Sequence, residues 1–425
     1  MGLADTYYSR TADQRIDRPA LIGAHDCDTA IVGGGLSGLT TAIELARAGH
    51  RVVVLDAQSI GFGASGRNGG IVSPHYACGE DKIERRVGLT RARELHRLSI
   101  EGVERVRANI ADLGLKSARP EPGILHLRRF DRADDIHAHA EAFARDYDYP
   151  LTYLDRAAIR DRMQTDRYFH GLLDAQAFHI HPLNYLHGLA RGIEALGSQI
   201  FEGSEVIGHR LKGPQKLLTT GSGTVSARHV VFATGGYTGA LMPQFKRAIL
   251  PIATYMTASE AAPDLIASAI RTREAIFDDR RAGDYYRVFD NGQRLLWGGR
   301  ITTRAASPDA VARILRREMI GVFPQLKELK TEIAWSGLMG YARHQMPQIG
   351  QYRPGVWHAT GFGGHGLNTT AIAGTVVSEA ILGQSDRIRQ FAPFGLDWAG
   401  GPLGLAAAQL SYWSLQAQDW WRERA

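Results

Sequence analysis

The chain has 425 residues, of which 44% are hydrophobic and 22% are charged, a balance typical of a globular protein with two or three domains. The formal net charge is +6, but basic and acidic residues are interspersed, so we expect no nucleic-acid partner. The two cysteines, Cys27 and Cys78, exclude a disulfide framework and a cysteine-based zinc site.

The first half of the chain begins with an expected irregular leader, residues 1–26. Residues 28–58 then read as strand, turn, helix and strand, with apolar residues at helical spacing before Gly49. A long amphipathic helix is expected from about residue 80 to 112. Short strands such as "GILHLRR" and a helix near 131–145 follow.

The second half starts with a helix at Pro182, where the missing N–H of proline is tolerated. Strands are expected in "SQIFEGSEVIGHRL" and "GTVSARHVVFATGG". Residues 247–345 alternate strands with one helix, "SPDAVARILRREMIGVFP". A strand, a glycine-rich loop and a helix then precede an amphipathic tail, residues 391–425.

The localisation signals are few. The N-terminus is polar and lacks the apolar core of a signal peptide, and no apolar run is long enough for a membrane span. We therefore expect a cytoplasmic protein. The tail combines Trp413, Trp420 and Trp421 with late arginines, a composition that also suits peripheral contact with a membrane surface.

The segment "GGGLSG" carries a dinucleotide-binding pattern, because it follows a strand and opens a helix. Gly33 permits the tight turn, Gly35 lets the backbone approach a diphosphate, and Gly38 lets helix and strand pack closely. Asp56 ends the next strand and is placed to accept hydrogen bonds from a ribose hydroxyl. An acidic residue there disfavours NADP.

A second G-x-G-x-x-G match, "GFGASG" from Gly61, fails the same test of context. It follows no strand of its own, and the glycines and proline after it exclude a regular helix. We interpret it as a loop that crosses a second face of the same cofactor, with Ser65 and Asn68 as small polar groups and Arg67 as a positive charge. The sequence therefore predicts one dinucleotide.

These segments, with "FHIHPLN" and "FGGHGLNTTAIAGTVVSEAILG", resemble the D-amino-acid oxidase and sarcosine oxidase superfamily, most closely its gamma-glutamylputrescine oxidase and L-pipecolate oxidase-like members. The resemblance runs from about residue 6 to the C-terminus. It implies an α/β protein in which a Rossmann-type FAD-binding domain is interleaved with an antiparallel-sheet α+β substrate domain. The expected FAD-binding segments are 27–80, 180–245 and 345–390, and the expected substrate-binding segments are 81–179 and 246–344.

The resemblance also implies the cofactor and its contacts. Val206 falls where the family clamps the adenine, and the loop near Gly366 lies under the flavin, where its N–H groups and the following helix would stabilise reduced flavin. The full set of expected FAD contacts is Gly33, Gly35, Leu36, Ser37, Gly38, Asp56, Ala57, Gly63, Ala64, Ser65, Arg67, Asn68, Gly69, Gly70, Val206, Thr234, Gly235, Gly361, Gly364, Gly366, Leu367 and Asn368.

Two departures from sarcosine oxidases matter. The segment "GLMGYARHQMPQIG" has no cysteine, so FAD is expected to be non-covalent. No lysine lies between Lys246 and Lys327, where those enzymes use one to activate oxygen. This puts fast oxidase behaviour in doubt, and both O₂ and a quinone stay open as electron acceptor.

The reaction that the resemblance implies is hydride transfer from a C–H beside nitrogen to flavin N5, after which the imine is hydrolysed. The expected substrate is an amine or amino acid, of secondary-amine or gamma-glutamyl-polyamine type. One alternative is an FAD dehydrogenase of a cyclic imino acid such as pipecolate or proline, which passes electrons to a quinone. A two-cofactor NAD(P)H reductase lacks its second nucleotide motif, and a flavin-binding scaffold or sensor is the non-enzyme alternative.

The candidate catalytic and substrate-pocket residues are His365 in the glycine-rich loop, Arg343 as a carboxylate anchor, and the aromatic residues Tyr255 and Tyr286, with Tyr285 and Trp297 beside them. No catalytic base is assigned. No metal is expected, because the pair His179 and His181 lacks convergent ligands and is interpreted as ordering the junction before Pro182.

Overall fold

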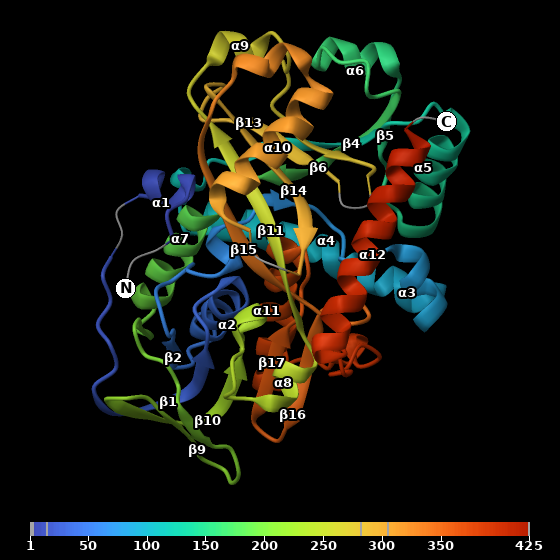
Figure 1. The fold of residues 1–425 in the computed structure, drawn as a ribbon. Coiled ribbons are helices and arrows are strands. Elements are labelled where there is room, and N and C mark those ends of the chain that lie inside the picture. Colours follow the sequence, from blue (N-terminus) through green and yellow to red (C-terminus); the bar gives the residue numbers. More distant parts are fainter. Residues whose placement is uncertain (1–3, 14–15, 281–282, 304–305, 424–425) are drawn as a thin grey trace.

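The computed structural model describes residues 4–13, 16–280, 283–303 and 306–423. Two sheets organise these residues, with helices between and around them (Figure 1). The first sheet comprises β1 (Gly23–Val32), β2 (Val52–Leu55), β7 (Gln199–Phe201), β8 (Gly208–Arg210), β9 (Lys216–Thr219), β10 (Gly223–Phe232), β16 (Gln348–Arg353) and β17 (Val356–Thr360).

The first sheet has the order β16-β17-β10-β1-β2-β7, and its five strands from β17 to β7 run parallel. Strands β1, β2 and β10 are rich in buried β-branched residues, as a sheet covered on both faces requires. Helix α2 (Leu36–Arg47) follows β1 directly and packs against α11 (Gly366–Leu382) and α7 (Pro182–Ala195). The sheet therefore draws on three distant parts of the chain.

The second sheet is mixed and mainly antiparallel, with the order β15-β11-β14-β13-β12-β4-β6-β3 and β5 paired to β6. Its strands are β3 (Ile71–Val72), β4 (Glu121–Arg128), β5 (Thr152–Leu154), β6 (His170–His179), β11 (Leu250–Ser259), β12 (Ala275–Asp278), β13 (Tyr285–Phe289), β14 (Arg294–Thr302) and β15 (Thr331–Tyr341). Among the described strands of this sheet, β12 and β4 form the one parallel pair. The α/β class with two interleaved domains is thus confirmed.

Helices of the second domain cover its sheet at the top of Figure 1. Helix α10 (Pro308–Val322) packs on β11, β14 and β15, and its inward Leu315 and Met319 join a core with Trp297. The other helices are α1 (Tyr7–Thr11), α3 (Glu80–Val87), α4 (Leu89–Asp112), α5 (Ala133–Tyr147), α6 (Arg156–Arg162), α8 (Pro243–Arg247), α9 (Pro263–Ala267) and α12 (Gly401–Arg422).

Three boundaries differ from the sequence-based expectations. The leader contains α1, whose Tyr7 and Tyr8 are buried, and β1 already begins at Gly23. The expected long helix from 80 to 112 is two helices, because Gly88 takes a positive φ of 79° between α3 and α4. In "SQIFEGSEVIGHRL", strand structure is confined to β7 and β8.

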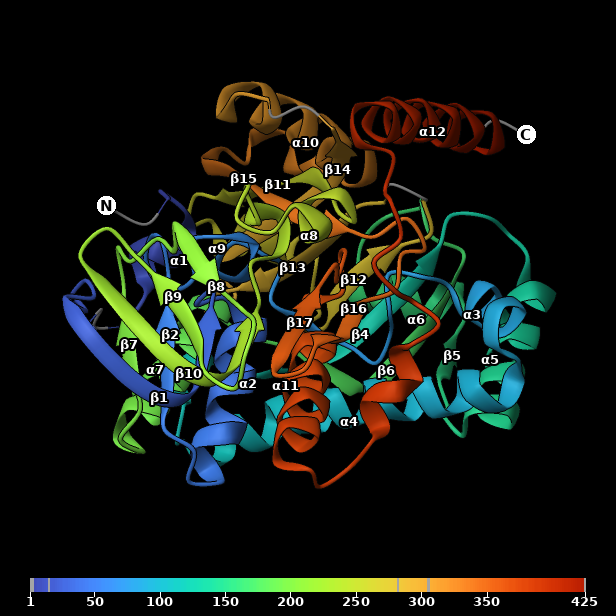
Figure 2. The same ribbon diagram turned by 90° about the horizontal axis from the view of Figure 1, so that it is seen from below.

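The tail forms α12, which lies on the outside of the second domain beside β14 (Figure 2). Glu423 at its end pairs with Arg280, and Gln409 accepts a hydrogen bond from the N–H of Thr303. Its outward face carries the exposed apolar side chains of Leu403, Leu410, Trp413, Trp420 and Trp421. Within the described residues, no helix combines the length and the apolar character needed to cross a membrane.

Candidate active site

A cavity of about 1030 Å³ opens at the carboxyl ends of β1, β10 and β17 and extends to the second sheet. Ligands of open α/β sheets bind at this edge, where loops from neighbouring strands converge. The predicted residues that line the cavity are Gly33, Gly35, Leu36, Ser37, Asp56, Ala57, Gly63, Ala64, Ser65, Arg67, Asn68, Gly69, Val206, Thr234, Gly235, Gly361, Gly364, His365, Gly366 and Leu367.

The turn after β1 brings bare backbone to the cavity wall. Gly33 has a φ of +113°, and a Cβ on Gly35 would lie 2.8 Å from Ser65 Oγ. Asp56 lines the same wall, and its carboxylate accepts hydrogen bonds from the N–H groups of Gly34 (2.6 Å) and Gln58 (2.8 Å). Burial raises the pKa of Asp56, and these two N–H groups oppose that rise. The turn and the acidic residue therefore form one unit at the start of α2.

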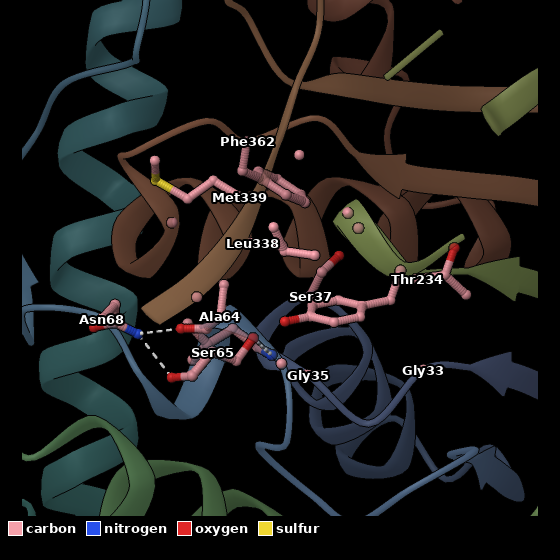
Figure 3. Close-up of a pocket in the computed structure, with 18 of the residues that line it drawn as sticks. Gly33, Gly35, Ser37, Ala64, Ser65, Asn68, Thr234, Leu338, Met339 and Phe362 are labelled. Carbon is pink, nitrogen blue, oxygen red and sulfur yellow. Dashed lines mark hydrogen bonds between the residues drawn. The ribbon is translucent and has the colours of Figure 1, made fainter. Parts of the chain in front are cut away.

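The second glycine segment is a loop with one short 3₁₀ turn, Ala64–Gly66, and it faces the first turn (Figure 3). Ser65 Oγ accepts a hydrogen bond from the N–H of Leu36 at 3.0 Å. Asn68 Nδ2 donates to the carbonyls of Ala64 (3.2 Å) and Ser65 (2.7 Å), which fixes the loop. Leu338, Met339 and Phe362 lie on the opposite side in Figure 3. Both glycine motifs thus border one cavity.

Three residues that were expected to contact FAD lie behind the residues that line the cavity and support them. A Cβ on Gly38 would lie 1.9 Å from the carbonyl oxygen of Gly33, and one on Gly70 would lie 2.1 Å from that of Ile180. Asn368 is buried, and its Nδ2 donates to the carbonyl of His75 at 3.1 Å. These residues shape the site without bordering the cavity.

The aromatic candidates for the substrate pocket lie on two different faces of the second sheet, and one of these faces borders the cavity. Tyr285 lines the cavity, whereas its neighbour Tyr286 points to the other face and stacks on Trp297 with ring centroids 4.1 Å apart. On β11, Thr254 lines the cavity and the adjacent Tyr255 is buried in the core with Trp297. Tyr255, Tyr286 and Trp297 are therefore core residues, and we do not propose them as substrate contacts.

His365 lines the cavity just before α11. Burial, with a smaller contribution from the charge of His75, lowers the pKa of His365 to about 4, so its imidazole is neutral at pH 7. Arg343 is exposed and lies outside the cavity lining. The structure thus brings His365, but not Arg343, to the site.

The junction before α7 uses its histidines within the protein. His181 Nδ1 accepts a hydrogen bond from the N–H of Asn184 at 3.2 Å and caps the helix. His179 contacts the carbonyl of Arg273 through Nε2 and Arg287 through Nδ1, both at 2.8 Å. This pair orders the chain next to Gly70.

The far end of the cavity was not foreseen from the sequence. Phe277, Tyr285 and Tyr341 give it aromatic walls, and Asp278 and Asp284 border it with their carboxyl groups almost fully buried in ion pairs. A short apolar strand ending in "DD" at 278–279 was the available signal, but nothing local places these residues next to the glycine turn at Gly33 to Gly38, about 240 residues earlier in the chain.

Two arginines bind these carboxyl groups: Arg129 lies outside the cavity lining, whereas Arg280 borders the cavity. Arg129, almost fully buried, pairs with Asp278 and, at 3.3 Å, with Asp284. Arg280 pairs with Glu318 (2.7 Å) and Glu423 (2.6 Å). Burial and the neighbouring Asp278 charge raise the pKa of Asp284 to about 7.

Sequence comparison assigns the chain to a family of flavoenzymes, in agreement with the nucleotide-binding turn and the cavity. The model of the family described as FAD dependent oxidoreductase (DAO) matches residues 28–380. The chain belongs to this family. It is 33% identical to the gamma-glutamylputrescine oxidoreductase of Escherichia coli K12 over 91% of each chain, and 23% identical to the glycine oxidase of Geobacillus kaustophilus over 90% of this chain and 99% of that one.

Solved structures share the fold. The glycine oxidase of Geobacillus kaustophilus superposes with a TM-score of 0.74 at 21% identity, covering 88% of this chain and 99% of the other. L-proline dehydrogenase from P. horikoshii gives a TM-score of 0.73 at 18% identity, covering 89% and 100%. Family membership makes the protein an FAD-dependent oxidoreductase, and the solved structures show that it has the same fold.

The described residues fit FAD. A diphosphate needs close backbone and a helix N-terminus, which the turn at Gly33 and Gly35 and the start of α2 provide. Asp56 offers an acceptor for ribose, and Val206 lies on the same wall. The glycine-rich loop before α11 and the N-terminus of α11 also border the cavity. They supply the positive partial charge that a reduced flavin needs.

Proposed function

We propose that the protein oxidises a C–N bond of an amine or amino acid, with gamma-glutamyl-polyamines and related secondary amines as the preferred class. The observation that carries this proposal is the cavity end with aromatic walls and two carboxyl groups, Asp278 and Asp284. The E. coli relative named gamma-glutamylputrescine oxidoreductase supports the same class. Bound FAD supplies the acceptor for two electrons and a proton.

The walls of this end suit a long substrate. Phe277, Tyr285, Tyr341 and Phe362 surround the space with flat apolar surface, which can hold a methylene chain and exclude water. An aromatic environment also favours the unprotonated amine, because burial disfavours the charged form. The amine must be unprotonated for its lone pair to assist loss of the C–H hydride.

The charge at this end favours a cation. Asp278 and Asp284 pair with Arg129, and Arg280 pairs with Glu318 and Glu423. These four carboxyl groups outnumber the two guanidinium groups, so the ionised cluster beside the cavity has a net negative charge. A second ammonium group of a polyamine-type substrate would be attracted to Asp278 and Asp284, whereas a small cyclic imino acid has no group to place there. This difference separates the proposal from its main alternative, a pipecolate or proline dehydrogenase.

The test is to add each member of a substrate panel to the FAD-loaded enzyme without oxygen. Reduction of the flavin is measured as the loss of its visible absorbance. We expect gamma-glutamylputrescine to reduce the flavin with a kcat/KM at least about 10-fold above that of L-pipecolate, L-proline and glycine. Asp284→Asn should raise KM for the polyamine substrate about 10-fold. Asp279→Asn is the matched control, because Asp279 lies outside the cavity lining and binds the N–H of Arg129. Preferential reduction by a cyclic imino acid would favour the alternative, and no reduction by any amine would refute C–N oxidation.

The electron acceptor is a separate proposal. The outward face of α12 exposes Leu403, Leu410, Trp413 and Trp421, and the exposed residues of this helix include no Asp or Glu. These features support contact with an anionic membrane surface, where a quinone could accept electrons. Sedimentation with anionic vesicles, lost in a Trp413→Ser/Trp421→Ser variant, and faster turnover with a quinone than with O₂ are the expected results. Absence of vesicle binding would contradict the membrane proposal.

A further inference from the structure

A second cluster of chemically active side chains lies beside the cavity, and the oxidation proposed above does not use it. It consists of His75 in the loop after β3, His126 on β4 and Asp174 on β6. One ligand atom from each residue, a ring nitrogen or a carboxylate oxygen, lies within 4.8 Å of the others. Because the three residues are far apart in sequence, the sequence alone predicted no metal site here.

The sheet register explains how two of these residues meet. Strands β4 and β6 are antiparallel, with Ile124 opposite Asp174 and His126 opposite Leu172. Residues two apart on a strand share a face, so His126 and Asp174 are diagonal neighbours on one face of the sheet. The loop after β3 then places His75 over that face.

Each of the three side chains is already oriented by another group. His75 Nδ1 lies 3.1 Å from Glu80 Oε1, which leaves Nε2 with its lone pair when Nδ1 carries the proton. Asp174 Oδ1 accepts hydrogen bonds from the Tyr149 hydroxyl (2.7 Å) and the N–H of Gln176 (3.1 Å). The His126 ring stacks on Phe277 with an interplanar angle of 8°. In metal sites, a carboxylate usually binds the second ring nitrogen of a ligating histidine, and hydrogen bonds usually fix a ligating carboxylate. Glu80 and the Tyr149 hydroxyl occupy these two positions here.

The remaining atoms of two of these side chains are unsatisfied. His126 Nε2 and Asp174 Oδ2 are both buried, and neither has a hydrogen-bond partner within the described parts of the chain. Asp174 is only 1% exposed. A buried polar atom without a partner costs about 1–3 kcal/mol, so an unpartnered imidazole nitrogen and an unpartnered carboxylate oxygen in one cluster indicate a missing partner.

We propose that His75 Nε2, His126 Nε2 and Asp174 Oδ2 bind one divalent cation of the zinc class. Two imidazole nitrogens and one carboxylate oxygen are a borderline donor set that suits Zn²⁺ and disfavours Mg²⁺ and Ca²⁺. Bonds of about 2.0–2.2 Å place the ligand atoms of a tetrahedral site about 3.4 Å apart. Side-chain rotations that move these atoms by about 1 Å would therefore bring them to bonding distance from one ion. The charges of Asp174 and Glu80 would balance the ion.

The ion would position one wall of the active site. Ala77, two residues after His75, lines the cavity, and Phe277 on the other side of His126 does so as well. The His75 carbonyl accepts a hydrogen bond from Asn368 in the first turn of α11, and the His75 and His365 rings lie 6.3 Å apart. A cation here would tie the loop after β3 to β4 and β6 and thereby hold these contacts. This inference does not depend on the identity of the substrate.

The experiment measures metal binding to the full-length, FAD-loaded protein after treatment with a chelator. We expect about one equivalent of Zn²⁺ to bind and to raise the unfolding temperature, and Co²⁺ to bind with absorption bands beyond the flavin spectrum. His126→Gln should weaken Zn²⁺ binding at least about 100-fold, and Glu80→Gln about 10- to 100-fold, with FAD content unchanged. His137→Gln, which removes an exposed histidine from α5, is the matched control and should bind Zn²⁺ like the wild type.

Two results would overturn the proposal. One is wild-type protein that binds less than about a tenth of an equivalent of Zn²⁺ or Co²⁺. The other is a His126→Gln or Glu80→Gln protein that keeps its FAD and binds Zn²⁺ as tightly as the wild type. If His126→Gln loses FAD, the Glu80→Gln protein alone decides, because Glu80 acts through His75.

Discussion

Replacing Gly38 with alanine tests the contact that sets the position of α2. A Cβ at residue 38 would lie 1.9 Å from the carbonyl oxygen of Gly33 and 3.3 Å from Ile31 Cγ2. Because a carbon and an oxygen this close must separate by more than about 1 Å, the first turn of α2 has to move away from the end of β1. That turn carries the N–H groups expected to face the FAD diphosphate.

The expected magnitude follows from the cost of overpacking. Forcing an extra methyl group into a close-packed contact costs about 1–3 kcal/mol. Apoprotein can relax the clash by shifting α2, but FAD binding needs the turn in its native place, so the cost falls on binding. A loss of this size corresponds to roughly 5- to 150-fold weaker FAD binding.

The assay is a titration of apoprotein with FAD, followed by flavin fluorescence, alongside thermal unfolding of the holoprotein. Gly321→Ala, near the end of α10, is the matched control, because a Cβ there meets nothing within 4 Å. That variant should bind FAD normally and gain up to about 1 kcal/mol in helix stability. A Gly38→Ala protein that binds FAD within about twofold of wild type and unfolds at the same temperature would show that this contact does not set the position of α2.

Three further predictions concern the site and its surroundings. Burial, then the charge of Arg287, lowers the pKa of His179 to about 3, so below pH 6.5 the unfolded chain takes up a proton there that the folded chain does not. His179 should therefore contribute about 2 kcal/mol to the unfolding free energy lost between pH 7 and pH 5, and in pH-dependent urea unfolding His179→Gln should lose about 2 kcal/mol less than the wild type over that range. His365→Asn should lower kcat/KM about 10-fold or more and Arg343→Ala less than about twofold; the reverse order in steady-state kinetics would contradict our placement of the site. Tyr285→Ala should raise KM about 10-fold, whereas Tyr286→Phe, which loses the 3.1 Å hydroxyl contact to Tyr168, should lower stability by about 1 kcal/mol with KM unchanged.

The parts of the site that the sequence predicts are those with a local signature. The turn from Gly33 to Gly38 is recognisable because strand, turn and helix adjoin in the chain, and the backbone itself forms the binding surface. The helix from Pro182 to Ala195 is predictable for the same reason, since its first turn and its apolar spacing are both local. The failed context test of the Gly61 segment likewise depends only on neighbouring residues.

Side-chain direction in the second sheet is not local. Tyr285 and Tyr286 are adjacent and identical in type, yet one faces the cavity and the other packs on Trp297. Which of the two points inward depends on the pairing of β13 with β14, where Tyr286 lies opposite Trp297. The pairing of β11 with β14 shifts register between Thr254 and Tyr255 as well. The alternation of residues within one strand does not show which face of the strand borders the cavity.

The chemistry at the far end of the cavity shows the same limit more strongly. Arg129 belongs to the chain after β4, Asp278 ends β12, and Glu423 follows α12, so their meeting depends on the parallel pairing of β4 with β12 and on the docking of the tail. Each residue alone reads as an ordinary surface charge. Burial and the neighbouring Asp278 charge raise the pKa of Asp284 only within this assembly, so the chemical character of this carboxyl group also comes from tertiary structure. Relatives that keep the glycine turn but replace this cluster should therefore share the cofactor and differ in substrate.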